Sequence, residues 1–112
     1  MTFLYLNSDT MGNGPDKELG QKLLTLFLEK IAASKVAVDM IGCVNGGVFL
    51  TTCEGPALEG LRLLEGRGAR IASCGTCLDH LGLRDSLKIG EVGAMDMTVQ
   101  IMAAADKVLQ PC

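Results

Sequence analysis

The chain turns from strand to helix within one segment, Arg70-Ile71-Ala72-Ser73-Cys74-Gly75-Thr76-Cys77-Leu78-Asp79-His80. Residues 69–73 form a short apolar run that predicts a buried strand, and residues 74–77 then lead into a helix. Ligands of α/β proteins bind beyond the carboxyl ends of parallel strands, where the next helix presents free N–H groups. A cysteine at such a junction is expected to be unusually acidic, because those N–H groups stabilise its thiolate. The segment therefore predicts a reactive sulfur site at Cys74.

Cys74 and Cys77 form a CxxC pair in this segment. One hypothesis makes Cys74 the nucleophile that attacks a persulfide or a disulfide, and makes Cys77 the resolving thiol. Thr76 followed by Asp79 resembles a capping box, which would start the helix at Cys77 and leave Cys74 just outside it. The alternative is that both cysteines are small buried hydrophobic residues. His80, the only histidine, is either an auxiliary group that tunes the thiolate or a surface residue.

A CxxC pair also occurs in two other kinds of thiol site, the thioredoxin-like dithiol and the zinc site. A thioredoxin-like dithiol requires the pair at a strand-to-helix junction, as here, although it usually lies near the start of such a domain. A zinc site requires four ligands, and the sequence contains no second CxxC and no HxxxH. We therefore expect no metal and no cofactor, and we keep a CxxC redox protein as an alternative.

Length and composition limit the class of protein. The 112 residues suffice for one core, so we predict a single domain over residues 1–112. The net charge of −3 is spread over interspersed charged residues and gives no basic face for nucleic acid. No apolar run approaches the ~20 residues that span a bilayer, and residues 1–6 do not resemble a signal peptide. The five cysteines are then expected to be free thiols in a reducing cytoplasm.

Strand and helix patterns alternate along the whole chain, which favours a parallel sheet with helices on both faces. A short helical turn is also expected at residues 48–52. Strands are predicted at residues 3–6, 36–41, 69–73, 87–92 and 107–109, and helices at residues 16–34, 56–66, 77–81 and 95–105.

Two of these helices have informative apolar faces. Helix 95–105 is apolar on both sides, as in a helix that is covered by a sheet on one side and by a neighbouring subunit on the other. In helix 16–34 a single stripe is predicted to face the core. It consists of Leu19, Leu23, Leu26, Phe27 and Ile31.

The loops that follow the first two strands are expected at the same sheet edge as Cys74. Loop 8–14 lacks both the Gly-Lys-Ser/Thr of a P-loop and the three-glycine dinucleotide spacing, so nucleotide binding is not predicted. Residues 45–47 offer backbone N–H groups to an anionic persulfide or selenide, unless their glycines serve turn geometry alone. The predicted binding residues are Met11, Gly12, Asn45, Gly46, Gly47, Gly75 and Thr76.

Several motifs in one order resemble the DsrE/DsrF-like family. They are SDTMG at residues 8–12, ELG at 18–20, NGGV at 45–48, CGTCLD at 74–79, GL at 82–83 and GEV at 90–92. The likeness extends from Phe3 to about Leu109. It is greatest to the C-terminal domain of YedF-type proteins, which are sulfurtransferase-like proteins of selenium metabolism.

The resemblance implies a three-layer α/β/α domain with a mainly parallel five-stranded sheet, often assembled into trimers or hexamers. In sulfur-relay members the persulfide-carrying cysteine ends the third strand, which matches Cys74, and Cys77 is a family-typical companion. YedF-type proteins commonly carry an N-terminal TusA-like domain that this sequence does not contain, so the chain is either a stand-alone form or a fragment of a longer protein. A stand-alone form would use a separate carrier, for which a TusA-like protein is a candidate.

The function expected from the sequence is therefore that of a sulfur carrier. Cys74 is expected to accept sulfane sulfur, or selenium, from a donor protein and to relay it to an acceptor protein. The alternative from a different class is a non-catalytic oligomeric binding module whose thiols are structural.

Overall fold

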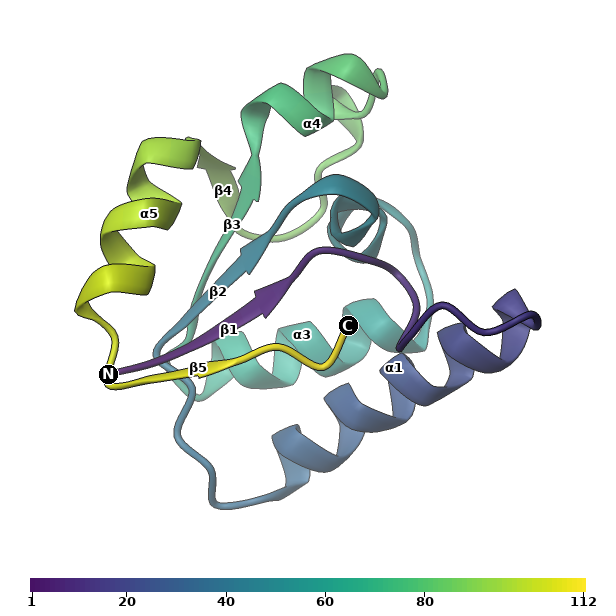
Figure 1. Ribbon diagram of the computed structural model, residues 1–112, viewed down its shortest axis with the longest axis horizontal. Coiled ribbons are helices and arrows are strands. Elements are labelled where there is room, and N and C mark those ends of the chain that lie inside the picture. Colours follow the sequence, from purple (N-terminus) through teal and green to yellow (C-terminus); the bar gives the residue numbers. More distant parts are fainter.

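Figure 1 shows a computed structural model of residues 1–112, in which five strands form one sheet. Every neighbouring pair of strands is parallel, and the order across the sheet is β4-β3-β2-β1-β5. The parallel sheet expected from the alternating pattern is confirmed. The strands are β1 (Thr2–Leu6), β2 (Met40–Cys43), β3 (Arg70–Cys74), β4 (Glu91–Gly93) and β5 (Lys107–Leu109).

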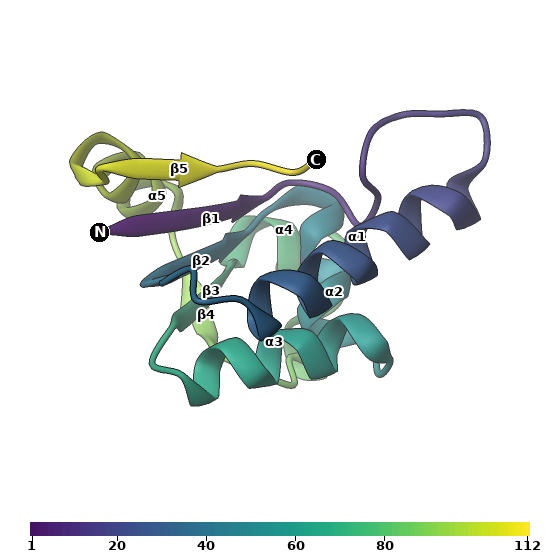
Figure 2. The same cartoon turned by 90° about the horizontal axis from the view of Figure 1, so that it is seen from below.

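The helices cover both faces of the sheet, which makes three layers (Figure 2). The chain steps in one direction from β1 to β3, so right-handed crossovers place α1 and α3 on the same face. It then crosses the sheet from β4 to β5 in the opposite direction, which puts α5 on the other face. The helices are α1 (Lys17–Ala33), α2 (Phe49–Thr52), α3 (Pro56–Gly66), α4 (Gly75–His80) and α5 (Met95–Ala104), with 3₁₀ turns η1 (Asn45–Val48) and η2 (Arg84–Ser86).

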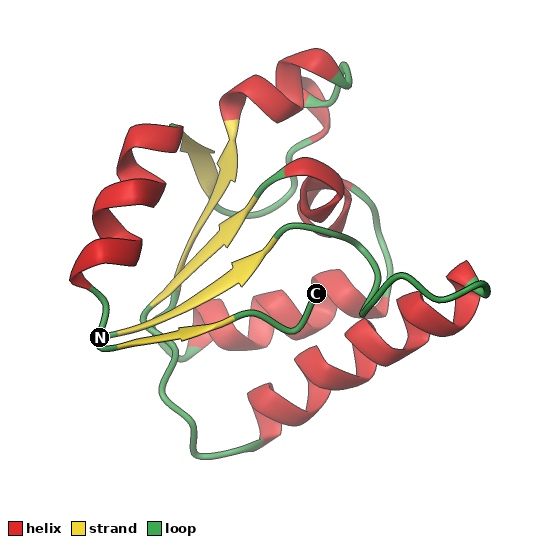
Figure 3. Ribbon diagram, viewed as in Figure 1, coloured by secondary structure: helices red, strands yellow, loops and turns green.

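Side chains alternate between the two faces of each strand. Leu4 and Leu6 of β1 and Ile41 of β2 join a core cluster of 17 buried residues between the sheet and helices α1 and α3. Phe3 and Tyr5 alternate onto the opposite face. Helix α5 lies on that face, since Phe3 lines a cavity together with Met97 and Thr98 of α5, and Figure 3 shows this helix across the strands from the longer helices. The main core therefore sits on the α1 and α3 side, and the α5 side is thinner.

The predicted buried stripe of α1 is wrong at three of its five residues. The buried residues are Gly20, Leu24, Leu28 and Ile31, and Phe27 packs partly buried against the core, whereas Leu19, Leu23 and Leu26 are exposed. The helix has apolar residues on both of these faces, and two glycines at close contacts determine which face is buried. A side-chain carbon on Gly20 would lie 2.9 Å from Cβ of Thr10, and one on Gly60 of α3 would lie 3.1 Å from Cβ of Leu28. These two glycines let the loop and α3 approach the face that becomes buried.

Two strands are shorter than the sequence predicts. β2 starts late because the Arg67 side chain donates a hydrogen bond to the carbonyl of Val36 and holds that segment outside the ladder. β4 also starts late, because the backbone N–H of Lys88 donates to the carbonyl of Thr51 rather than to a strand. The predicted helical turn at residues 48–52 is confirmed as α2. None of the helices has the length and apolar character needed to cross a membrane.

Candidate functional site: a thiol pair at the end of β3

Cys74 is the last residue of β3 and the N-cap of α4, which begins at Gly75. The predicted start of this helix at Cys77 is therefore wrong. No side chain caps the helix, and Thr76, the proposed capping residue, is an exposed residue of its first turn. Gly75 permits the early start, because a side-chain carbon there would lie 3.0 Å from Cγ1 of Val92 on β4.

The two thiols of the CxxC pair face one another. Side chains at the N-cap and at the third helical position are neighbours in the first turn, and Cys74 is close enough to Cys77 to raise the pKa of its thiol. Their access to solvent differs, since Cys74 is only 5% exposed whereas Cys77 is half-buried. Cys77 is thus the more accessible sulfur of the pair.

Cys77 receives a hydrogen bond from a distant loop. The backbone N–H of Asn45, the first residue of η1, donates to Sγ of Cys77 at 3.1 Å. This contact confirms that the loop after β2 and the CxxC segment meet at one edge of the sheet. It also makes Asn45 the one predicted binding residue whose N–H is aimed at a thiol.

The electrostatic setting of Cys77 differs from the expectation for this junction. Burial raises the pKa of the Cys77 thiol, and the hydrogen bond and negative charge of Cys74 raise it further. The N–H of Asn45 opposes them by stabilising the thiolate. Desolvation of the Cys77 thiol therefore exceeds its stabilisation by one amide donor, and the reactive thiolate that the sequence predicts at Cys74 stays a prediction.

Tyr5 lies on the same face of the sheet as α5 and was not among the predicted site residues. Its position on β1 pairs with Gly42 of β2. Burial raises the pKa of the Tyr5 phenol, and the negative charges of Cys77 and Cys74 raise it further. The alternation along residues 2–6 was an available signal, since it sets Tyr5 on the face opposite the main core.

A small cavity lies between the sheet and α5, and Cys74 lines it. Its volume is about 30 Å³, and a cavity needs roughly 10–15 Å³ to hold one water molecule. The walls are mostly apolar, so the space beside Cys74 suits one or two small, weakly polar atoms. Its lining includes Phe3, Gly42, Ala72, Ala94, Met97 and Thr98.

The glycines of loop 45–47 have different roles. A side-chain carbon on Gly47 would lie 2.1 Å from the carbonyl oxygen of Leu6, so only glycine allows this turn to pass the end of β1. Gly46 lies against the backbone of Asp9 without such crowding. The close approach explains Gly47 by packing alone, which was the alternative that the sequence left open.

Met11 and Gly12 make contacts that serve the fold. Met11 packs against the main core, and its N–H donates to the carbonyl of Gly20 on α1 at 2.9 Å. Gly12 is exposed with a φ of 74°, and its carbonyl accepts from the Thr10 hydroxyl. These contacts assign both residues to the turn before α1, and the structure shows no contact between them and the thiols.

An ion pair between Asp79 and Arg84 lies at the end of α4. Arg84 donates to both carboxylate oxygens of Asp79, at 2.6 and 3.0 Å, and this lowers the pKa of that carboxyl. Asp79 was expected to cap the helix and does not. The Arg84 guanidinium lies beside Gly75, where a side-chain carbon would be 3.1 Å from Nη2. His80 is exposed at the end of the helix.

All five cysteines are free thiols, and three of them lie outside the pair. Cys43 is buried in the main core, where burial and the nearby Cys112 raise its pKa to about 12. Cys112 is half-buried, with Sγ 3.7 Å from the carbonyl oxygen of Ser8. Cys53 is exposed between α2 and α3. No group of three or more His, Cys, Asp or Glu side chains is placed to hold a metal ion.

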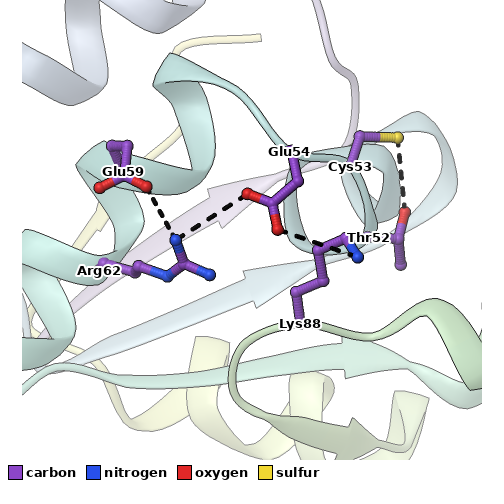
Figure 4. A network of polar contacts seen from close by, with 6 residues as sticks. All are labelled: Thr52, Cys53, Glu54, Glu59, Arg62 and Lys88. Carbon is purple, nitrogen blue, oxygen red and sulfur yellow. Dashed lines mark hydrogen bonds and ion pairs between the residues drawn. The ribbon is translucent and has the colours of Figure 1, made fainter.

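Figure 4 shows the polar network around Cys53. The Glu54 carboxylate lies 4.0 Å from both Arg62 and Lys88, and Arg62 also pairs with Glu59 at 2.8 Å. A larger groove of about 330 Å³ between α1, α2 and α3 is lined by Cys53 and contains neither thiol of the CxxC pair. Cys53 is therefore an exposed thiol outside the candidate site.

Comparison with solved structures gives the fold a name. The YchN protein from E. coli superposes with a TM-score of 0.65 at 20% sequence identity, covering 97% of each chain. The fold is DsrE-like. MTH1491, a protein of unknown function from Methanobacterium thermoautotrophicum, matches with a TM-score of 0.67 at 16% identity, over 98% of this chain and 97% of the other. No protein-family model and no curated protein matches the sequence.

Helix α5 leaves an apolar surface uncovered on this DsrE-like fold. No residue of the helix is buried, and its exposed apolar side chains include Met97, which also lines the cavity beneath the helix. This agrees with the sequence pattern of two apolar faces, and the neighbouring subunit that the pattern suggested stays a prediction. The exposed apolar residues are Met95, Met97, Val99 and Met102.

Proposed function

We propose that the protein is a sulfur carrier that holds sulfane sulfur as a persulfide on Cys74, within the Cys74–Cys77 pair. The observation that carries this proposal is the position of Cys74, which neighbours a second thiol in the first turn of α4 and lines a small apolar cavity. The DsrE-like fold and the motifs that resemble YedF-type domains support the same function. Selenium is the alternative cargo, since the same thiolate chemistry carries it.

Loading and unloading would be exchange reactions at sulfur. A thiolate of the pair attacks the outer sulfur of a donor persulfide, R–S–SH, forming a new S–S bond while the donor leaves as R–S⁻. Unloading repeats the step with a thiolate of the acceptor as nucleophile. Because one S–S bond forms for each that breaks, neither an oxidant nor a reductant is consumed.

The partners follow from this chemistry. The donor and the acceptor are proteins or small molecules with an accessible thiol, and a TusA-like carrier is the candidate that the family resemblance supplies. The five free thiols support a cytoplasmic location, because a reducing cytoplasm keeps cysteines reduced. Assembly of several copies through the outer side of α5 would leave the carboxyl edge of β3 open to such partners.

Intact mass measurement tests the proposal. The protein is incubated with glutathione persulfide, freed of the donor and weighed, and the modified residue is located by fragmentation. We expect the wild type and Cys53→Ser to gain one sulfur atom on Cys74, and Cys74→Ser/Cys77→Ser to gain none at this segment. A wild type that gains no sulfur, or a double variant that gains as much as the wild type, contradicts the proposal.

A non-catalytic binding module is the second candidate, and the low exposure of Cys74 favours it. Under that hypothesis the pair is part of the packing, so both thiols stay unmodified by the persulfide donor in the folded protein. The same mass measurement separates the two functions.

A further inference from the structure

We infer that the two thiols work in a fixed order, in which Cys77 receives sulfur from the donor and Cys74 then stores it in the cavity beneath α5. This inference rests on the proposed function and assigns a separate task to each thiol. The order differs from the one predicted from the sequence, in which Cys74 is the attacking nucleophile and Cys77 its companion.

Access to the donor is the first reason. A thiolate must approach the outer sulfur of the donor persulfide directly, and the rate of exchange depends on that access. Cys74 is 5% exposed and faces a cavity of about 30 Å³, which admits no donor molecule. Cys77 is half-buried at the carboxyl edge of β3 and is therefore the thiol that a donor meets first.

The hydrogen bond from Asn45 is the second reason. Its N–H lies 3.1 Å from Sγ of Cys77, and hydrogen bonds to an ionised group are stronger than bonds to a neutral one. The N–H of Asn45 therefore offsets part of the cost of burying the Cys77 thiolate, both when Cys77 attacks and when it leaves after passing its sulfur on. No N–H donor to Cys74 is found in the structure.

Contact between the two sulfurs provides the transfer. In the first step the Cys77 thiolate attacks the donor, giving Cys77–S–SH and R–S⁻. In the second step the Cys74 thiolate attacks the outer sulfur of Cys77–S–SH, giving Cys74–S–SH and the Cys77 thiolate. Each step forms one S–S bond and breaks one, and the positions of the two side chains, at the N-cap and in the first turn of α4, place them as neighbours for the second step.

The cavity accounts for storage. The outer sulfur of a Cys74 persulfide needs space for about one small atom, and the cavity that Cys74 lines offers roughly that space. Its walls are mostly apolar and bind water weakly, and its small volume excludes free thiol molecules that would remove the sulfur. The stored persulfide is then released only through Cys77 or through movement of α5.

Single variants test the order. Loading with glutathione persulfide is followed by rapid quenching and intact mass, in the wild type, Cys74→Ser, Cys77→Ser and the control Cys53→Ser. We expect Cys77→Ser to load at least about ten-fold more slowly than the wild type, because the exposed nucleophile is lost. Cys74→Ser is expected to load at nearly the initial rate of the wild type, but to lose its sulfur rapidly to added thiol.

A cavity-filling variant tests the storage step. Thr98→Leu narrows the cavity from α5, so the sulfur it receives is expected to stay on Cys77 and to be lost to added thiol as fast as in Cys74→Ser. Val99→Leu, on the exposed side of the same helix, is the matched control and should retain sulfur like the wild type. Unfolding midpoints confirm that each variant is folded before its loading is compared.

The outcomes separate this inference from the proposed function. A wild type that takes up no sulfur refutes both. A wild type that loads normally, together with a folded Cys77→Ser that loads at the same rate, refutes the order and leaves the carrier function in place. Equal retention of sulfur by Thr98→Leu and Val99→Leu refutes storage in the cavity.

Discussion

The backbone N–H of Asn45 donates to Sγ of Cys77 across a separation of 32 residues. The contact joins the loop after β2 to helix α4, so the sulfur site is built by two neighbouring strand ends rather than by the CxxC segment alone. Asn45 has a φ of 51°, in the left-handed region that few residues other than glycine and asparagine adopt. The conformation of one loop residue therefore sets the environment of the thiol.

Replacement of Asn45 tests this dependence. Asn45→Val is expected to destabilise the protein by about 1–2 kcal/mol, because a β-branched residue is strained at this φ. The displaced N–H would also stabilise the Cys77 thiolate less, which raises its pKa further and slows alkylation. Asn45→Gly adopts the same φ without strain and serves as the control in denaturant unfolding and iodoacetamide labelling. Equal behaviour of the two variants would show that the loop does not govern Cys77.

The raised pKa of Cys77 predicts a distinct pH dependence of alkylation. Its ordinary value is 9.0, and burial together with Cys74 raises the pKa above it. Since only the thiolate reacts, the labelling rate of Cys77 should still be rising at pH values where a free thiol has reached its plateau. A peptide of residues 70–84 is the control. A plateau for the protein at lower pH than for the peptide would mean that the thiol is acidic after all.

Cys43 predicts a loss of stability at alkaline pH. Its pKa is raised from 9.0 to about 12, so the folded state keeps this proton after the unfolded chain has released it. Stability from this group is thus complete below pH 9 and falls as the pH rises, by on the order of 4 kcal/mol at its full extent. Cys43→Ala should lower stability near neutrality through lost packing, and should show a shallower alkaline decline. Parallel pH profiles of unfolding free energy for both proteins would contradict this prediction.

Alanine substitutions at Gly47 and Gly46 form a matched pair of variants that tests the close approach of this loop to β1. Gly47→Ala forces a side-chain carbon to 2.1 Å from the carbonyl oxygen of Leu6, so we expect it to cost roughly 2–4 kcal/mol of stability. At Gly46 the nearest atom would be 3.5 Å away, an ordinary contact, and Gly46→Ala should fold nearly as well as the wild type. Denaturant titrations compare the two, and a Gly47→Ala variant of normal stability would disprove the close approach.

The orientation of α1 is tested at two adjacent leucines. Leu24 is fully buried and Leu23 is 39% exposed. Leu24→Ala should destabilise the protein by about 2–4 kcal/mol through the cavity it leaves, and Leu23→Ala should cost less than about 1 kcal/mol. If the larger loss in urea unfolding came from Leu23→Ala, the stripe first read from the sequence would be the buried one.

Hydrophobic periodicity and turn residues were enough to place β1, α3, α5 and β5 within a residue or two, because each of these elements has one clear pattern between strong boundary signals. They failed where two patterns overlap. Leucines occupy both candidate faces of α1, and the choice between them was made by Gly20 and by Gly60, which lies on a different helix. Close approach between distant segments leaves no local trace in the sequence.

The alternation of strands and helices was enough to predict the parallel sheet, because short right-handed crossovers leave few other topologies for such a chain. The same alternation put Cys74 at a carboxyl strand end and brought the Asn45 loop to the same edge. Which thiol is accessible, which one lines a cavity and which receives an N–H emerged from the folded chain alone. Solvent access and desolvation depend on atoms of α5, β1 and η1 that are remote in the sequence from the CxxC pair, so no motif encodes them.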